Sequence, residues 1–167
     1  MRAVLLTITA CFALALAGCG SDSSSSTEAS DTSSSEQAKP AKPPAPKTKP
    51  TVKVPSATPP KKLEIKDLEE GSGPAAKAGD EVTVQYVGVN YKTGKQFDAS
   101  WDRGEPLVFT LGENRVIQGW EEGLEGMKAG GRRELIIPPN LGYGSEASGA
   151  IPANETLVFV VDLEAVK

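Results

Sequence analysis

Apolar and polar residues alternate over much of the C-terminal part of the chain. Val82, Val84 and Tyr86 are separated by Thr83 and Gln85, and this period of two predicts a strand with one buried face. Similar patterns predict further strands over residues 63–68, 96–100, 107–111, 132–137 and 156–165. We therefore expect a sheet of four to six strands.

One segment follows a helical period instead. Ile117, Trp120, Leu124 and Met127 recur at three- or four-residue spacing, which predicts a helix over residues 118–127 with an apolar stripe facing the sheet. The pair Gly130-Gly131 is expected to end it. Many strands with one short helix indicate an α+β fold with an antiparallel sheet, over residues 61–167.

The N-terminal part has a different organisation. Residues 1–18 form a short basic start and an apolar run, which suits a signal peptide better than a spanning helix. The run ends in Leu16-Ala17-Gly18-Cys19, which resembles the bacterial lipobox, and that resemblance implies cleavage before Cys19 and lipidation of its sulfur. Ordinary signal cleavage after Ala17, giving a secreted protein, is the alternative.

Residues 19–60 lack the apolar surface needed for a core. The first half is rich in Ser, Asp and Thr, and the second half alternates Lys with Pro. Such tracts are typical of disordered segments, and the prolines favour an extended spacer. We expect a tether, and contact of its Lys-Pro repeats with cell wall or anionic headgroups stays open.

The composition excludes several kinds of chemistry. The chain has no histidine, and its two cysteines are Cys11 and Cys19. The predicted domain therefore has neither an imidazole nor a thiol for catalysis, and it offers no histidine-containing zinc site. A net charge of −4 argues against nucleic acid as a partner. We expect no metal and no cofactor.

Five short motifs then carry a specific resemblance. They are Tyr86-Val87-Gly88, Phe97-Asp98, the stretch VIQGWEEGL at residues 116–124, LGYG at residues 141–144, and Ile151-Pro152. In order and spacing they resemble the FKBP-type peptidyl-prolyl cis-trans isomerases, the macrolide-binding immunophilins, over residues 62–166. The resemblance implies a twisted antiparallel sheet wrapped around one short helix. It also implies a minimal isomerase domain without an added chaperone lobe.

The resemblance also implies a set of site residues. Trp120 would be the floor for the prolyl ring, the Ile117 N–H and the Tyr143 hydroxyl would hold substrate carbonyls, and Asp98 would orient the amide. The implied catalytic residues are Asp98, Tyr143, Trp120 and Phe159. The implied substrate-binding residues are Tyr86, Phe97, Leu107, Val116, Ile117 and Ile151.

Packing alone could explain several of these residues. Tyr86 and Phe159 occupy inward positions of strands, and Trp120 lies on the apolar stripe of the helix. Asp98 could pair with Arg103 across a turn. Tyr143 lies between two glycines in a loop, where binding explains a large aromatic residue better than packing does.

Two departures from the family concern the rim of the expected pocket. Leu107 and Leu141 stand where many members carry aromatic residues, and the loop over residues 145–150 lacks bulky side chains. We therefore expect a shallower rim. The departures put macrolide affinity and substrate preference in doubt more than catalysis.

The first functional hypothesis is an isomerase of Xaa-Pro bonds in exported proteins, outside the cytoplasm and anchored to the membrane through Cys19. Its expected partners are proline-containing exported polypeptides, the membrane and macrolides such as tacrolimus, and we expect a monomer. The alternatives are a binding module that grips proline-containing segments with little turnover, and a purely structural lipoprotein. The aromatic set together with Asp98 favours the enzyme.

Overall fold

The computed structural model describes residues 47–167, which include a six-stranded antiparallel sheet. The strands are β1 (Glu64–Glu69), β2 (Glu81–Asn90), β3 (Gln96–Ala99), β4 (Leu107–Thr110), β5 (Arg132–Ile137) and β6 (Leu157–Val166). Their order is β1-β5-β6-β2-β3, and β4 pairs with β2 beside β3. The helices are α1 (Ser100–Arg103), α2 (Gln118–Leu124) and a 3-10 turn at Pro139–Leu141.

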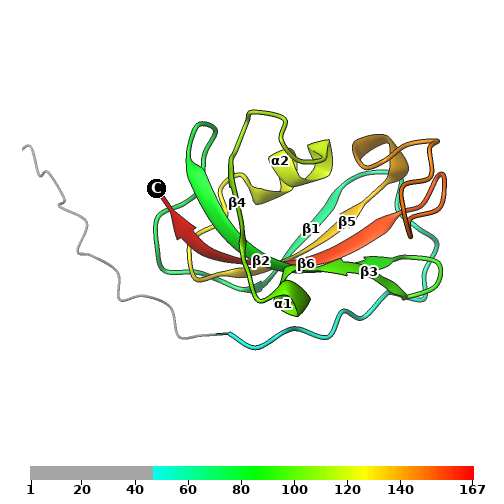
Figure 1. The fold of residues 1–167 in the computed structure, drawn as a ribbon, viewed down its shortest axis with the longest axis horizontal. Coiled ribbons are helices and arrows are strands. Elements are labelled where there is room, and N and C mark those ends of the chain that lie inside the picture. The colour runs from blue at the N-terminus through cyan, green and yellow to red at the C-terminus, as the bar shows by residue number, and fades with distance from the viewer. Residues whose placement is uncertain (1–46) are drawn as a thin grey trace, which may run out of the picture. The chain divides into compact units, whose positions relative to one another are not determined.

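The helix α2 lies over one face of the sheet, which we call the inner face (Figure 1). Val82, Val84 and Tyr86 of β2 point to this face and join the main core with Trp120 and Leu124 of α2. The alternation of β2 sends other side chains, such as Val87 and Val89, to the opposite, outer face. The predicted fold class is confirmed.

The helix α2 is shorter than predicted. It ends at Leu124 rather than Met127, because Glu125 has an extended backbone and Gly126 has a φ of 74°, which turns the chain away from the helix axis. Met127 is still buried in the main core. The apolar stripe therefore marked the buried residues correctly, but it did not mark the end of the helix.

The strand boundaries differ little from the prediction, and two short helical turns were missed. Strand β5 occupies Arg132–Ile137, as predicted, whereas β3 ends at Ala99 and the chain then forms α1. The turn at Pro139–Leu141 was also not predicted. Neither segment is long enough to show a helical period in the sequence.

Residues 47–60 differ from the expectation of a disordered tether, because they lie against the outer face (Figure 1, cyan). Val52 and Val54 pack on the apolar residues there, and the Tyr91 hydroxyl donates to the Ala57 carbonyl at 3.1 Å. The prediction assumed one buried face for β2, but both faces are buried. The outer face needs a cover, and this segment supplies it.

The remaining predictions for the N-terminal part fall on residues 1–46, which lie outside the described residues. They are the signal peptide, the lipidation of Cys19 and most of the tether. Within residues 47–167, no helix combines the length and apolar character needed to cross a membrane.

Candidate active site

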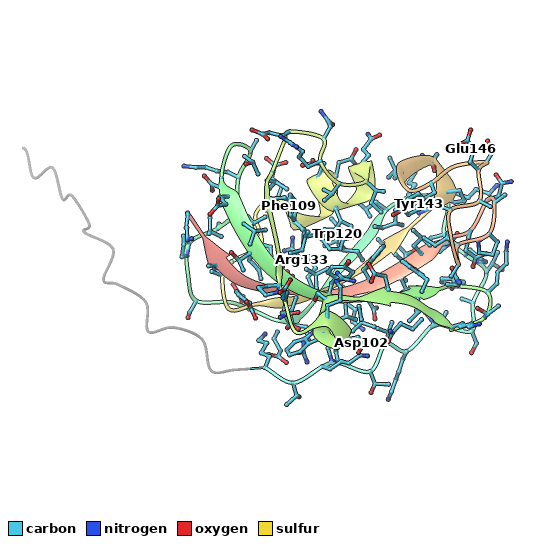
Figure 2. All side chains as sticks on the ribbon, viewed as in Figure 1. Asp102, Phe109, Trp120, Arg133, Tyr143 and Glu146 are labelled. Atoms are coloured by element: carbon cyan, nitrogen blue, oxygen red, sulfur yellow. The ribbon has the colours of Figure 1, made fainter. Side chains whose placement is uncertain are left out.

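A cavity of about 340 Å³ opens between α2 and the inner face of the sheet. Four strands (β2, β3, β4 and β6), the start of α2 with the residues before it, and the loop after β5 contribute to its walls. The lining residues are Tyr86, Phe97, Asp98, Leu107, Arg115, Val116, Ile117, Trp120, Tyr143 and Phe159. In Figure 2, Trp120 lies between α2 and the sheet, and Tyr143 comes from the loop after β5.

Aromatic rings form the deep part of the cavity around Trp120. The Tyr86 and Phe159 rings lie 5.1 Å and 5.3 Å from the indole, both nearly perpendicular to it. Phe97 meets Phe159 in the same way at 5.5 Å, and Phe109 packs on Trp120 at 6.0 Å. Edge-to-face contacts of this kind are favourable, and perpendicular rings form walls instead of closing into a flat stack.

Gly88 makes room for two of these rings. A Cβ at this position would lie 2.6 Å from Cζ of Phe97 and 2.7 Å from Cε1 of Phe159, well inside van der Waals contact. Gly88 pairs with Phe159 across β2 and β6, so the missing side chain lies directly behind the aromatic wall. The glycine is required by this close approach, because its φ is not in the left-handed region.

The polar edge of the cavity is a hydrogen-bonded group of three residues. The Tyr86 hydroxyl donates to the Asp98 carboxylate, and Arg103 donates to Asp98 and, at 2.9 Å, to the Tyr86 oxygen. The Arg103 guanidinium also lies 5.7 Å from the centre of the Tyr86 ring. Each of these three hydrogen bonds goes to Asp98 or to the hydroxyl bound to it.

These contacts keep Asp98 ionised. Partial burial would raise the pKa of its carboxyl, but the hydrogen bonds from Tyr86 and Arg103 outweigh burial and hold the pKa below its ordinary value. Burial and the bond to Asp98 raise the pKa of the Tyr86 hydroxyl. The edge of the cavity therefore carries a fixed carboxylate next to a fixed guanidinium at neutral pH.

A buried serine connects this edge to the sheet. The Ser100 hydroxyl accepts a hydrogen bond from the Tyr86 N–H at 2.8 Å and donates to the Gln85 side chain. Ser100 is the first residue of α1, and it is fully buried. The bond therefore fixes α1 against β2 at the level of the cavity.

Comparison with known proteins identifies the family. Residues 73–164 match the family described as "FKBP-type peptidyl-prolyl cis-trans isomerase". The chain belongs to this family. It is therefore an FKBP-type peptidyl-prolyl cis-trans isomerase, as the motifs predicted.

Several relatives match this chain over nearly their whole length. An "FK506-binding protein" of Streptomyces anulatus is 57% identical over 120 residues, which are 71% of this chain and 97% of the relative. A "Probable FK506-binding protein" of Corynebacterium glutamicum is 50% identical over 115 residues, 69% of this chain and 96% of the relative. The match to both therefore covers far more than the pocket motifs.

Solved FKBP structures share the fold. The crystal structure of AtFKBP13 is similar with a TM-score of 0.59 and 36% identity, covering 63% of this chain and 93% of that one. FkpA from Escherichia coli gives a TM-score of 0.59 and 45% identity, covering 70% of this chain and 52% of FkpA. The similarity to FkpA thus accounts for about half of that protein.

Nine of the ten predicted pocket residues of this FKBP domain line the cavity. The exception is Ile151, which is buried in the main core and is not among the lining residues, so its expected place on the loop side stays a prediction. Its backbone pairs with Ser148 in the loop after Tyr143, and its side chain belongs to the same core cluster as Trp120 and Phe159, which line the cavity.

The packing alternatives turn out to be compatible with a site. Trp120 is 3% exposed and belongs to the main core, yet it lines the cavity. Asp98 pairs with Arg103, as the structural alternative predicted, and also lines the cavity. Tyr143 is 42% exposed, in agreement with its interpretation as a loop residue available for binding.

The sequence did not point to two features of the site. Arg115 lines the cavity with a largely exposed side chain, 3.5 Å from Glu113, and its place just before Val116 was the available signal. The role of Gly88 was hidden because an isolated glycine in a strand does not reveal which rings approach it. Within residues 47–167, no group of three or more acidic, histidine or cysteine side chains could hold a metal ion.

Proposed function

We propose that the cavity around Trp120 binds the prolyl ring of an Xaa-Pro segment and lowers the barrier to rotation about the amide bond. This barrier is about 18–20 kcal/mol without a catalyst. The twisted transition state loses the charge separation of the planar amide, so an apolar enclosure stabilises it relative to the ground state. The enclosure of Trp120 by Tyr86 and Phe159 is the observation that carries this proposal.

The polar groups at the edge are proposed to hold the peptide. The Ile117 N–H donates no backbone hydrogen bond to another residue between 47 and 167, which leaves it available for a substrate carbonyl. Tyr143 would donate its hydroxyl to a second carbonyl. Asp98, held by Tyr86 and Arg103, would orient the amide next to the aromatic walls.

The test is isomerisation of a short Xaa-Pro peptide by the purified protein and by its Asp98→Asn variant. This variant keeps the size of the side chain, so we expect normal folding with kcat/KM lowered about tenfold, or about 1.4 kcal/mol of transition-state stabilisation. An unchanged rate would make Asp98 a structural residue of the pocket. Circular dichroism of both proteins provides the control for folding.

The same assay addresses macrolides. The relatives are named for binding FK506, also called tacrolimus, and we propose that this cavity binds it too. Leu107 lines the cavity without the ring that many family members carry there, so affinity should be lower than in members with that ring. Turnover without inhibition by tacrolimus would contradict macrolide binding while leaving the enzyme intact.

We further propose that the protein acts on exported polypeptides while anchored through lipidated Cys19. Support comes from the lipobox-like sequence LAGC at residues 16–19 and the polar segment that follows it. More than one acyl chain on the protein would make anchoring stable. Replacing Cys19 by Ser should release the protein from the membrane fraction, and a variant that still sediments with membranes would contradict the anchor.

A further inference from the structure

Residues 47–60, which we call the strap, contact the outer face of the sheet and the short helix α1, whose Arg103 bonds to Asp98 and Tyr86 at the polar edge of the cavity. We propose that residues 49–54 of the strap position the polar edge of the active site, acting through α1. This inference rests on the role proposed above for Asp98. Lys49, Val52 and Val54 are then positioning residues, because they touch neither the cavity nor a substrate.

The first contact is polar. Lys49 donates from its Nζ to Asp102 of α1 at 2.5 Å, and Gln96 of β3 donates to the other oxygen of the same carboxylate at 2.7 Å. Asp102 thus connects the strap, α1 and the start of β3. Figure 2 labels Asp102 on α1, on the side of the strap.

The second contact is apolar. Val52, Val54 and Trp101 pack against one cluster on the outer face, and Ala99 belongs to that cluster. Ala99 is the residue between Asp98 and α1, and it is 3% exposed. Displacing the two valines would expose the packing that holds this junction.

The helix α1 cannot maintain its own position. It has four residues and no side-chain hydrogen bond at its N-cap, and a helix of this length is unstable without tertiary contacts. The Trp101 indole N–H is buried without a hydrogen-bond partner among residues 47–167, so this side of α1 is held by packing. Ser100 fixes α1 to β2 on one side, and the strap covers the other.

Two residues of the polar edge lie at or near the two ends of α1. Asp98 lies two residues before it and Arg103 is its last residue, and the two side chains meet at the Tyr86 hydroxyl. A small shift of α1 would change both contacts at once. Misplacement of about 1 Å by a distant mutation can lower a rate up to a hundredfold.

The strap also contains a matched control. Lys47 is near Lys49 in sequence, but its ammonium pairs with Glu69 at 2.9 Å and lies 3.5 Å from Asp162, away from α1. Replacing Lys47 or Lys49 by Ala removes the same charge from the same segment. Only the change at Lys49 removes a contact to α1.

The test is a double-mutant cycle on the purified full chain, read as kcat/KM for an Xaa-Pro peptide. We expect the double change V52S/V54S to lower kcat/KM about tenfold in the native background and less than about twofold in the Asp98→Asn background. Lys49→Ala should lower it about twofold to threefold, Lys49→Arg should restore it, and Lys47→Ala should leave it unchanged. Thermal unfolding of each variant verifies that the assay temperature lies below the transition.

Each unfavourable outcome has a distinct meaning. Equal losses in the two backgrounds, or equal effects of Lys47→Ala and Lys49→Ala, would show a general loss of stability and overturn the positioning role. If V52S/V54S does not fold, the comparison of Lys49→Ala with Lys47→Ala still decides the test. Full activity of Asp98→Asn alone would instead overturn the role of Asp98, and any strap effect that remained would not act through it.

Discussion

The two faces of the sheet both carry a buried apolar cluster, a large one on the inner face and a smaller one on the outer face. On the inner face, β6 contributes Phe159, whose ring stands perpendicular to Trp120 beside a cavity of about 340 Å³. On the outer face, the preceding residue Val158 is fully buried in a cluster made mostly of aliphatic residues, and Val52 and Val54 pack against this cluster. Two consecutive residues of one strand thus lie beside the cavity on one face and beneath the strap on the other.

The difference teaches that side-chain shape, more than backbone geometry, makes the site. Valines on a pleated surface pack closely against a covering chain, whereas perpendicular rings stand up from the sheet. Gly88 strengthens the contrast, because it is inward-facing and lacks a side chain between Phe97 and Phe159. The cavity beside these rings on the inner face is therefore the place proposed for the prolyl ring.

The largest expected effect is that of Trp120→Ala, which removes the centre of the inner face. We expect the free energy of unfolding to fall by about 3–5 kcal/mol and kcat/KM to fall about a hundredfold. Trp120→Phe is the matched variant, because the indole N–H has no protein partner between residues 47 and 167 and a smaller ring preserves part of the wall. Denaturant unfolding and peptide isomerisation measure both quantities. Full activity in a folded Trp120→Ala protein would contradict the pocket.

The change Gly88→Ala should come next, since it adds one methyl group behind the aromatic wall. A Cβ 2.6 Å from Phe97 would push the rings toward the cavity, and we expect a loss of about 1–3 kcal/mol in stability with kcat/KM lowered about tenfold. Val158→Ala is the control on the outer face, where about 1–3 kcal/mol should be lost without a change in kcat/KM. Equal activity losses in the two variants would remove the functional distinction between the faces.

The pH dependence of activity should be flat near neutrality. The chain has no histidine, so kcat/KM should stay constant from about pH 5 to 9. Because the pKa of Asp98 is lowered in the folded protein, its ionised form stabilises the fold above the ordinary value of 3.8. That contribution is lost as the pH falls below this value. Activity should then decrease about fivefold in acid.

Tryptophan fluorescence at each pH separates this effect from acid unfolding. In the Asp98→Asn variant the acid decrease should be absent wherever the protein remains folded. A bell-shaped profile centred near neutral pH would contradict this expectation, because it would require two groups that titrate close to neutrality.

Much of this arrangement could be predicted from the sequence, for identifiable reasons. The period of two located β2, and the stripe of α2 identified Trp120 and Leu124 as buried residues. The same period led to a wrong prediction for the outer face. Thr83 and Gln85 made this face of β2 look polar, but the later residues Val87 and Val89 on the same face are apolar and buried. The Lys- and Pro-rich composition of the strap then concealed Val52 and Val54, which supply that cover.

Site residues could be predicted where the residue type and its local sequence indicate binding by themselves. They could not be predicted where the role depends on which residues lie nearby in the fold. Tyr143 between two glycines indicated binding directly, and Tyr143 lines the cavity. The place of Ile151 stays a prediction, since an isoleucine in a loop can face either the cavity or the core, and Ile151 belongs to the core cluster without being among the lining residues. Arg115 was missed, because a charged residue beside a motif gives no sign of whether it points to the site.

The smallest expected effect concerns Arg115, the charged residue at the rim of the inner face. Its guanidinium lies 3.5 Å from Glu113 with a mostly exposed side chain, so it can approach a charged residue next to the bound proline. An exposed charge pair contributes about 0.2–1 kcal/mol, so we expect Arg115→Glu to reduce kcat/KM for a Glu-Pro peptide about twofold to fivefold relative to a Lys-Pro peptide. The preference should weaken at high salt.

Lys53→Glu, on the strap of the outer face, changes the net charge equally and should leave this ratio unchanged. A shift of the same size in both variants would attribute the effect to net charge, and the rim would then have no part in selecting the peptide.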